Sequence, residues 1–189
     1  MKEKITGSLI WENAMRAGLI LGGISVAYEL LSLLPGLVGG FFGAVLSGVL
    51  FLVRIAKIVA IILLLKRMMF ALTETYEGVT RREARRFGFE ATLLSSLIVA
   101  GFSLISVIYL TPGLATTFSE ALHESLSSMN TIPDVPDLKA QVEAQAAWFV
   151  RNFNVLVFVT SFIYCALWGV ILTLIQTGRF DAPSPFDKP

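Results

Sequence analysis

Two stretches of the chain are as long as a membrane is thick and carry no charged side chain. They cover residues 91–110 and 155–175. The hydrocarbon core of a bilayer is about 30 Å thick, and an α-helix rising about 1.5 Å per residue crosses it in about 20 residues. Because a spanning segment must satisfy its own backbone hydrogen bonds, both stretches are predicted to be transmembrane helices.

Two further stretches have the same length but contain ionisable residues. Residues 17–34 include Glu29, and residues 41–65 include Arg54 and Lys57. Ionisable residues within a transmembrane helix are tolerated when they face other helices. The chain is therefore predicted to have an all-α fold with four transmembrane helices, at about residues 15–34, 41–65, 91–110 and 155–176.

Composition supports one membrane domain spanning residues 1–189. The chain is 55% hydrophobic and 15% charged, whereas soluble domains carry about 25% charged residues. The net charge is only +1, which argues against nucleic acid as a partner. Cys165 is the only cysteine, so an intrachain disulfide is excluded. The expected partners are membrane lipids and another membrane protein or a second copy of the chain.

The distribution of charge predicts the topology. Residues 66–90 contain six Lys or Arg, and residues 111–154 contain five acidic residues against two basic ones. By the positive-inside rule, 66–90 is a cytoplasmic loop and 111–154 lies outside. Four spans then place both termini in the cytoplasm, and residues 177–189 are expected to form a flexible tail.

The connecting segments have their own patterns. Between the first two spans, Pro35 and the paired glycines that follow predict a tight reversal over residues 34–40. In the outer segment, Thr111 and Pro112 are typical of a helix N-cap and first helical position. Apolar residues then recur at steps of three or four from 114 to 129 and from 138 to 149. We expect two short amphipathic helices lying on the outer membrane surface.

The ionisable residues inside the first two spans are the most informative candidates for a site. Glu29 and Arg54 form a candidate intramembrane ion pair, although the hairpin geometry requires some stagger between them. Arg54 and Lys57 are also candidate contacts for an anionic ligand such as a lipid phosphate. A proton or ion pathway is the third interpretation.

Small residues recur every four positions along the first two spans. Such ridges let helix backbones approach closely in a membrane. Packing within the hairpin is the favoured interpretation, with homodimerisation or partner docking as the alternative. The candidate packing residues are Gly18, Gly22, Gly36, Gly40, Gly43, Ala44, Ser47 and Gly48.

A row of arginines precedes the third span, at Arg81, Arg82, Arg85 and Arg86. It could bind anionic lipid headgroups or an acidic partner, or it could simply set the topology. No pattern indicates catalytic residues, a cofactor or a metal site. The spacing of Glu120 and His123 occurs in carboxylate-bridged metal sites, but this is the only histidine in the chain.

Short motifs around the third span resemble a known family. They are residues 76–80 (YEGVT), 85–91 (RRFGFEA) and 109–112 (YLTP), with Phe118 beyond them. They are similar to domain-of-unknown-function family 4199, uncharacterised bacterial inner-membrane proteins, although the outer segment here is longer. The resemblance covers most of the chain in order and hydropathy. It implies the bacterial inner membrane and a polyprenyl-phosphate glycosyltransferase as partner.

The predicted function is a non-enzymatic accessory or scaffold subunit that packs against another membrane protein, and the family resemblance implies such a lipid-linked glycosyltransferase as that partner. The alternative is a small transporter or lipid-handling protein that uses Arg54, Lys57 and Glu29. The four spans show no inverted repeat, because the uncharged last two do not mirror the charged first two. Discontinuous helices around a cavity would favour the alternative, and continuous helices with an apolar exterior would favour the scaffold.

Overall fold

The computed structural model describes residues 3–128 and 136–178. Within these residues, four helical segments are long and apolar enough to cross a membrane. The predicted all-α fold with four long apolar helices is therefore confirmed. The four segments are Gly7–Val38, Gly40–Thr75, Arg81–Leu110 and Phe153–Thr177.

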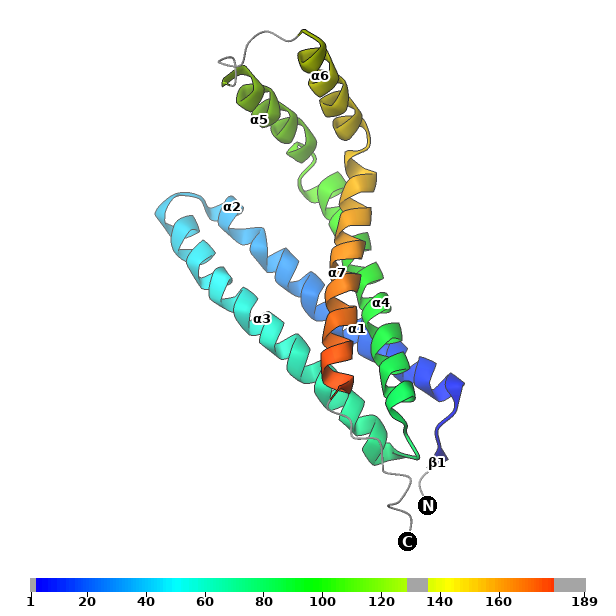
Figure 1. Ribbon diagram of the computed structural model, residues 1–189. Coiled ribbons are helices and arrows are strands. Elements are labelled where there is room, and N and C mark those ends of the chain that lie inside the picture. Colours follow the sequence, from blue (N-terminus) through cyan, green and yellow to red (C-terminus); the bar gives the residue numbers. More distant parts are fainter. Residues whose placement is uncertain (1–2, 129–135, 179–189) are drawn as a thin grey trace. The chain divides into compact units, whose positions relative to one another are not determined.

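The described part of the chain is almost entirely helical (Figure 1). In chain order they are β1 (Glu3–Lys4), α1 (Gly7–Ser32), α2 (Leu34–Val38), α3 (Gly40–Thr75), β2 (Tyr76–Glu77), α4 (Arg81–Ile105), the π-helical turn η1 (Ser106–Leu110), α5 (Leu114–Ser128), α6 (Pro136–Arg151) and α7 (Phe153–Thr177).

The reversal between the first two spans is shorter than predicted. Residues 34–38 are helical and form α2, so the chain turns only at Gly39 and Gly40. Both glycines have positive φ, 65° and 55°, which is a conformation that residues with a Cβ rarely adopt. The paired glycines therefore account for the turn, and Pro35 fits into the first turn of α2, where its missing N–H is tolerated.

The helices on either side of the basic segment are longer than their apolar stretches. α3 continues past Lys66 to Thr75, and α4 already begins at Arg81. Most of the segment predicted as a loop is therefore helical. Met69 and Phe87 explain the extension, because both are almost fully buried and pull these helix ends into the core.

A capping box starts α4. The Thr80 backbone N–H donates to Glu83 Oε2 at 2.7 Å, and the Glu83 N–H donates to Thr80 Oγ1 at 3.3 Å. This reciprocal arrangement satisfies two donors that a helix start leaves without partners. Just before it, β1 and β2 form a two-residue parallel ladder that ties the start of the described chain to the end of α3.

Contacts divide the chain into two compact units. The first contains α1 to α3, α4 as far as Val99, and α7 from Phe162 onwards. Its core joins α1, α3 and α4 through the following buried side chains: Ile10, Ala14, Ala17, Leu21, Leu65, Met69, Leu72, Ala84, Phe87 and Ala91.

The second unit covers residues 100–161. Phe118 of α5 lies 4.9 Å from Phe149 of α6 between ring centroids, and Phe153 lies 5.7 Å from Phe149. The predicted helix start at Thr111 is wrong, because α5 begins at Leu114 and the Thr111 hydroxyl instead donates to the Ser106 carbonyl at 3.3 Å. Residue 129 lies outside the described residues, and a membrane-surface position for α5 and α6 stays a prediction.

Candidate intramembrane partner site

Lys57 is the centre of a polar cluster within the first unit. Its Nζ lies 4.4 Å from the centroid of the Tyr28 ring, a distance typical of a cation–π contact. The Tyr28 hydroxyl in turn donates to the Leu50 carbonyl at 3.3 Å. Glu29 and Cys165 lie in the neighbourhood of Lys57. α1, α3 and α7 therefore all contribute to this cluster.

Tyr28 and Cys165 were not among the predicted site residues. Tyr28 could have been noticed, since it directly precedes Glu29 in an otherwise apolar span, and amphipathic rings often accompany buried cations. Cys165 had no such signal, because its position depends on how α7 packs. The proposed pairing of Glu29 with Arg54 stays a prediction.

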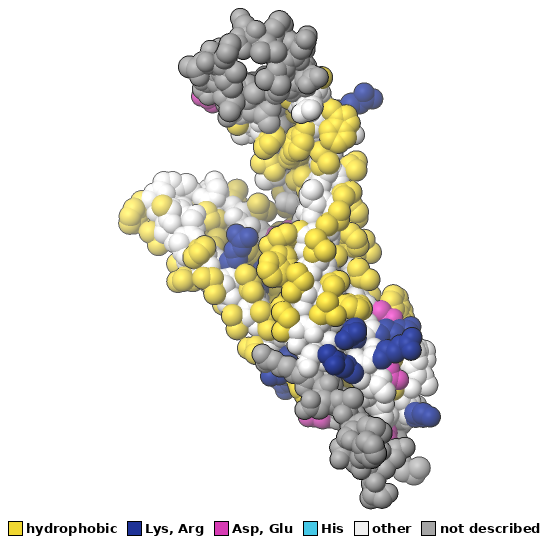
Figure 2. All heavy atoms as spheres, viewed as in Figure 1, with side chains coloured by type: hydrophobic (Ala, Val, Ile, Leu, Met, Phe, Trp, Pro, Cys, Tyr) yellow, Lys and Arg dark blue, Asp and Glu magenta, His cyan; other side chains and the backbone are white. Residues whose placement is uncertain are grey.

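Arg54 differs from Lys57 in its surroundings. Lys57 is half-buried, whereas Arg54 is exposed on the surface of α3. Its neighbours Phe51 and Ile55 are also exposed, by 62% and 48%. Figure 2 shows Lys and Arg side chains among apolar ones on this hairpin. An arginine near the middle of a span costs about 2.5–3.5 kcal/mol on insertion scales, so it is usually paired with an acceptor.

Gly18 and Gly22 of α1 pack against α4, not against α3. A Cβ at Gly18 would lie 2.7 Å from the Cβ of Leu94, and a Cβ at Gly22 would lie 3.0 Å from that of Ile98. Such distances mean that the two backbones approach as closely as glycine permits. The contact of these two glycines is therefore with α4, whereas packing within the first hairpin was the favoured prediction.

The glycines of the hairpin turn and of α3 behave differently from one another. Gly43 is buried, and a Cβ there would lie 2.9 Å from the Pro35 carbonyl oxygen of α2. At Gly36, Gly40 and Gly48, an added Cβ would meet none of the described atoms within 4 Å outside the neighbouring backbone. Among the described residues, close packing within the hairpin is thus seen at Gly43, and a packing role for Gly36, Gly40 and Gly48 stays a prediction.

The small residues predicted to form one ridge do not all lie on the same helix face. Gly36 belongs to α2 and is separated from Gly40 by the turn, so the two do not share a helix face. Within α3, steps of four and three residues place one set of exposed residues on a single stripe. We call this the α3 outer stripe, and it consists of Gly40, Ala44, Ser47, Phe51, Arg54 and Ile58.

The α3 outer stripe combines two features that are costly in lipid. Gly40, Ala44 and Ser47 present almost no side-chain surface, so lipid tails gain little contact there. Arg54 presents a charge on the same stripe, about the middle of the apolar stretch. Only 11% of the most apolar part of α3 is buried. A stripe of this kind can accept a second helix at short range with an acceptor opposite Arg54.

α4 and α7 meet through a pair of matched glycine–threonine steps. A Cβ at Gly88 would lie 2.5 Å from Thr173 Cγ2, and a Cβ at Gly169 would lie 2.5 Å from the Cβ of Thr92. Each helix thus places a glycine opposite a threonine of the other. This contact was missed from the sequence, although both steps follow the four-residue spacing of small residues that indicates close packing.

The arginine row lies at the start of α4. Arg81, Arg82 and Arg86 are exposed, and Arg85 is half-buried. Arg86 Nε donates to Glu90 Oε1 at 2.7 Å, so one of the four is already paired within the helix. Figure 2 shows Lys and Arg side chains gathered at this end of the first unit. Lipid or partner binding by the row stays a prediction.

Comparisons of the chain with protein-family models, with curated proteins and with solved structures find no match. The resemblance to family 4199 therefore stays a prediction. The α3 outer stripe and the Lys57 cluster therefore rest on the geometry of this chain alone.

Proposed function

We propose that the chain is a non-enzymatic accessory or scaffold subunit that binds another membrane protein through the α3 outer stripe. The observation that supports this most directly is the exposure of Arg54 on the same stripe as Gly40, Ala44 and Ser47. The proposal places the protein in the bacterial inner membrane with both termini in the cytoplasm, and α5 and α6 on the outer surface.

The physical argument concerns what drives association in lipid. Lipid tails are as apolar as leucine, so helices associate through close backbone packing and polar contacts. The small residues of the stripe supply the first, and Arg54 supplies the second. The partner helix is expected to carry a carboxylate or another strong acceptor at the depth of Arg54, because a guanidinium pairs best with such groups.

A second copy of the chain is the simplest partner, and a lipid-linked glycosyltransferase is the one that the family resemblance implies. The rival proposal is a small transporter or lipid-handling protein built on Arg54, Lys57 and Glu29. α3 is continuously helical from Gly40 to Thr75, and transporter sites are typically built from interrupted helices. The continuity of the helix that carries both cations supports the scaffold.

Three glycine substitutions separate binding from folding. Gly48 borders the stripe and Gly23 lies exposed on α1, and a Cβ at either would meet none of the described atoms within 4 Å. Gly43 is packed against Pro35. Gly48→Leu should release the partner and leave the subunit stable. Gly23→Leu should leave both the complex and the stability of the subunit unchanged, and Gly43→Leu should destabilise the subunit itself.

The measurement is the mass of the complex by native mass spectrometry after gentle extraction, with unfolding of each purified variant as the companion assay. Gly48→Leu and Gly23→Leu share the same gain in helix propensity, about 1 kcal/mol, so a difference between them reports the surface alone. A wild-type protein that is a lone monomer and moves a solute or lipid in liposomes would overturn the scaffold in favour of the transporter.

A further inference from the structure

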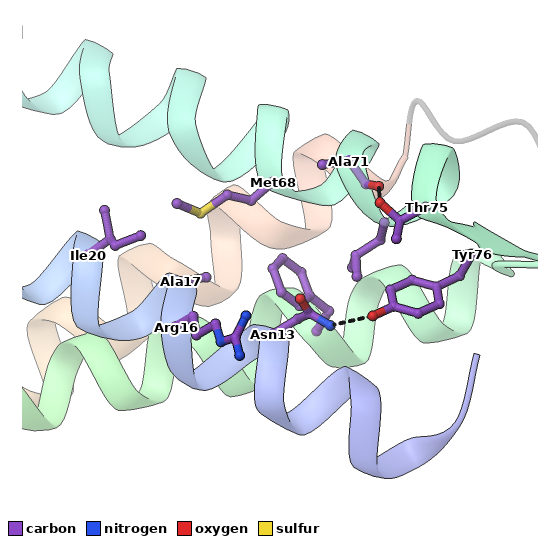
Figure 3. A pocket seen from close by; sticks show the side chains of 10 residues that line it. Asn13, Arg16, Ala17, Ile20, Met68, Ala71, Thr75 and Tyr76 are labelled. Carbon is purple, nitrogen blue, oxygen red and sulfur yellow. Dashed lines mark hydrogen bonds between the residues drawn. The ribbon is translucent and has the colours of Figure 1, made fainter. Parts of the chain in front are cut away.

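A pocket of about 200 Å³ lies within the first unit, between α1, the end of α3 and the start of α4 (Figure 3). It is separate from the α3 outer stripe and from the Lys57 cluster. Its polar lining residues are Asn13, Arg16, Thr75 and Tyr76, and its apolar ones include Ala17, Ile20, Met68, Leu72 and Phe87.

Hydrogen bonds orient the side chains at the polar end of the pocket. Asn13 Nδ2 donates to the Leu9 carbonyl at 2.8 Å and to the Tyr76 hydroxyl oxygen at 3.2 Å (Figure 3). Both amide protons of Asn13 are thus engaged, and the hydroxyl of Tyr76 acts here as acceptor. The hydroxyl proton of Tyr76 is therefore available to donate to a ligand.

Arg16 adds a positive charge beside these groups. Its Nη2 donates to Glu12 Oε1 at 2.6 Å, one turn earlier on α1, and both side chains are largely exposed. A guanidinium has five N–H donors, so this pair leaves donors for a second acceptor. Because exposed ion pairs are weak, a phosphate could share or replace the Glu12 carboxylate.

The apolar end of the pocket opens toward the surface of the first unit. Ile20 is 48% exposed and Met68 is half-buried, whereas Phe87 and Leu72 form the closed side, 1% and 4% exposed. In Figure 3, Ile20 and Met68 lie on the side away from the Asn13–Tyr76 pair. A molecule that fits this lining has one anionic end and one hydrocarbon end.

We propose that this pocket binds the phosphate head and the first carbons of an anionic amphiphile. Arg16 and Tyr76 hold the phosphate oxygens, and the hydrocarbon chain of the ligand extends past Ile20 and Met68 into the surrounding lipid. The volume agrees, since pockets for drug-sized molecules measure about 300–1,000 Å³ and this one has room for a head and a short chain segment. Arg16 precedes the first apolar stretch, where a lipid headgroup would lie.

The test compares four probes on the full-length protein purified in a non-ionic detergent and stripped of lipid. Dioleoylphosphatidylglycerol and dodecyl phosphate carry both the anion and the chain. Dioleoylphosphatidylcholine carries the chain with a zwitterionic head, and inorganic phosphate carries the anion alone. Binding is measured by native mass spectrometry for the lipids and by the shift in melting temperature for the other two.

The matched variants are Arg16→Gln in the pocket and Arg67→Gln at an exposed position of α3. Arg16→Gln should weaken dodecyl phosphate and phosphatidylglycerol binding about tenfold or more, as expected for losing a charge-assisted hydrogen bond. Arg67→Gln should leave the binding of both ligands unchanged. Binding of phosphatidylglycerol with no binding of dodecyl phosphate would support the proposal and would restrict the ligand to a bilayer lipid.

Several results would overturn the proposal. Equal weakening by Arg67→Gln would show that any positive charge on the protein attracts the ligand, and equal binding of phosphatidylcholine would show that the anion is not recognised. Binding of inorganic phosphate as strong as that of dodecyl phosphate would show that the pocket does not recognise the hydrocarbon chain of the ligand. If Arg16→Gln failed to fold, Tyr76→Phe and the pocket-filling Ala71→Phe would carry the same test, and unchanged binding in both would refute the site.

Discussion

The glycine–threonine contact between α4 and α7 allows a prediction with a built-in control. Carbon atoms in ordinary contact lie about 3.5–4.0 Å apart. A Cβ at Gly88 would lie 2.5 Å from Thr173 Cγ2 and 2.9 Å from its Oγ1, but 3.2 Å from its Cβ. Gly88→Ala therefore forces the helices or the threonine to move by about 1 Å, and overpacking of this kind costs about 1–3 kcal/mol.

The two ends of the contact should respond differently to a second substitution. Thr173→Ala removes both close atoms, so the Gly88→Ala/Thr173→Ala pair should regain most of the loss. At Gly169 the closest atom is the Cβ of Thr92, at 2.5 Å, and alanine keeps that atom. Gly169→Ala should therefore stay destabilised when combined with Thr92→Ala.

The assay is reversible unfolding in mixed micelles with a rising fraction of denaturing detergent, analysed as two double-mutant cycles. The reasoning predicts a clear favourable coupling between the substitutions at 88 and 173. It predicts almost none between those at 169 and 92. Equal rescue at both ends, or single substitutions without any loss of stability, would refute the close approach of the two helices.

Three further outcomes are expected. In a cysteine-free background, a membrane-impermeant thiol reagent on spheroplasts should label a cysteine that replaces Ser127 and not one that replaces Thr75; the reverse pattern contradicts the predicted topology. Lys57→Leu should lower the free energy of unfolding by about 1–2 kcal/mol, the value of a desolvated cation–π contact, while exposed Arg54→Leu should change it little; equal losses in a detergent-unfolding titration would contradict the distinction. Glu83→Ala should cost about 0.5–2 kcal/mol through the lost capping box, and unchanged unfolding would show that the core alone holds the start of α4.

The four helices could be predicted from the sequence because a long, predominantly apolar run has few alternatives in a membrane protein. Their ends could not, since the run stops where charges begin, whereas α3 continues past Lys66 to Thr75. What extends the helix is burial of Met69 against other helices, and that depends on tertiary packing. The capping box at Thr80 and Glu83 was readable as a Thr-x-x-Glu pattern.

The small-residue ridges show a second limit of sequence reasoning. Gly18 and Gly48 both lie on four-residue repeats of small residues in apolar spans. In the structure Gly18 packs closely against α4, and Gly48 contacts none of the described side chains. A repeat identifies a helix face on which close approach is possible. It does not identify the helix that will occupy the face, because that depends on the whole arrangement of the chain.

The central claim is that another protein covers the α3 outer stripe, and cross-linking in the native membrane tests it most directly. A photoreactive amino acid is placed at Ser47 or Phe51, on the stripe, and at Leu97 of α4 as an exposed control. The account predicts protein cross-links to a second chain, or to a second copy, from Ser47 and Phe51 and none from Leu97. Cross-links only to lipid or within the same chain at all three positions would contradict it.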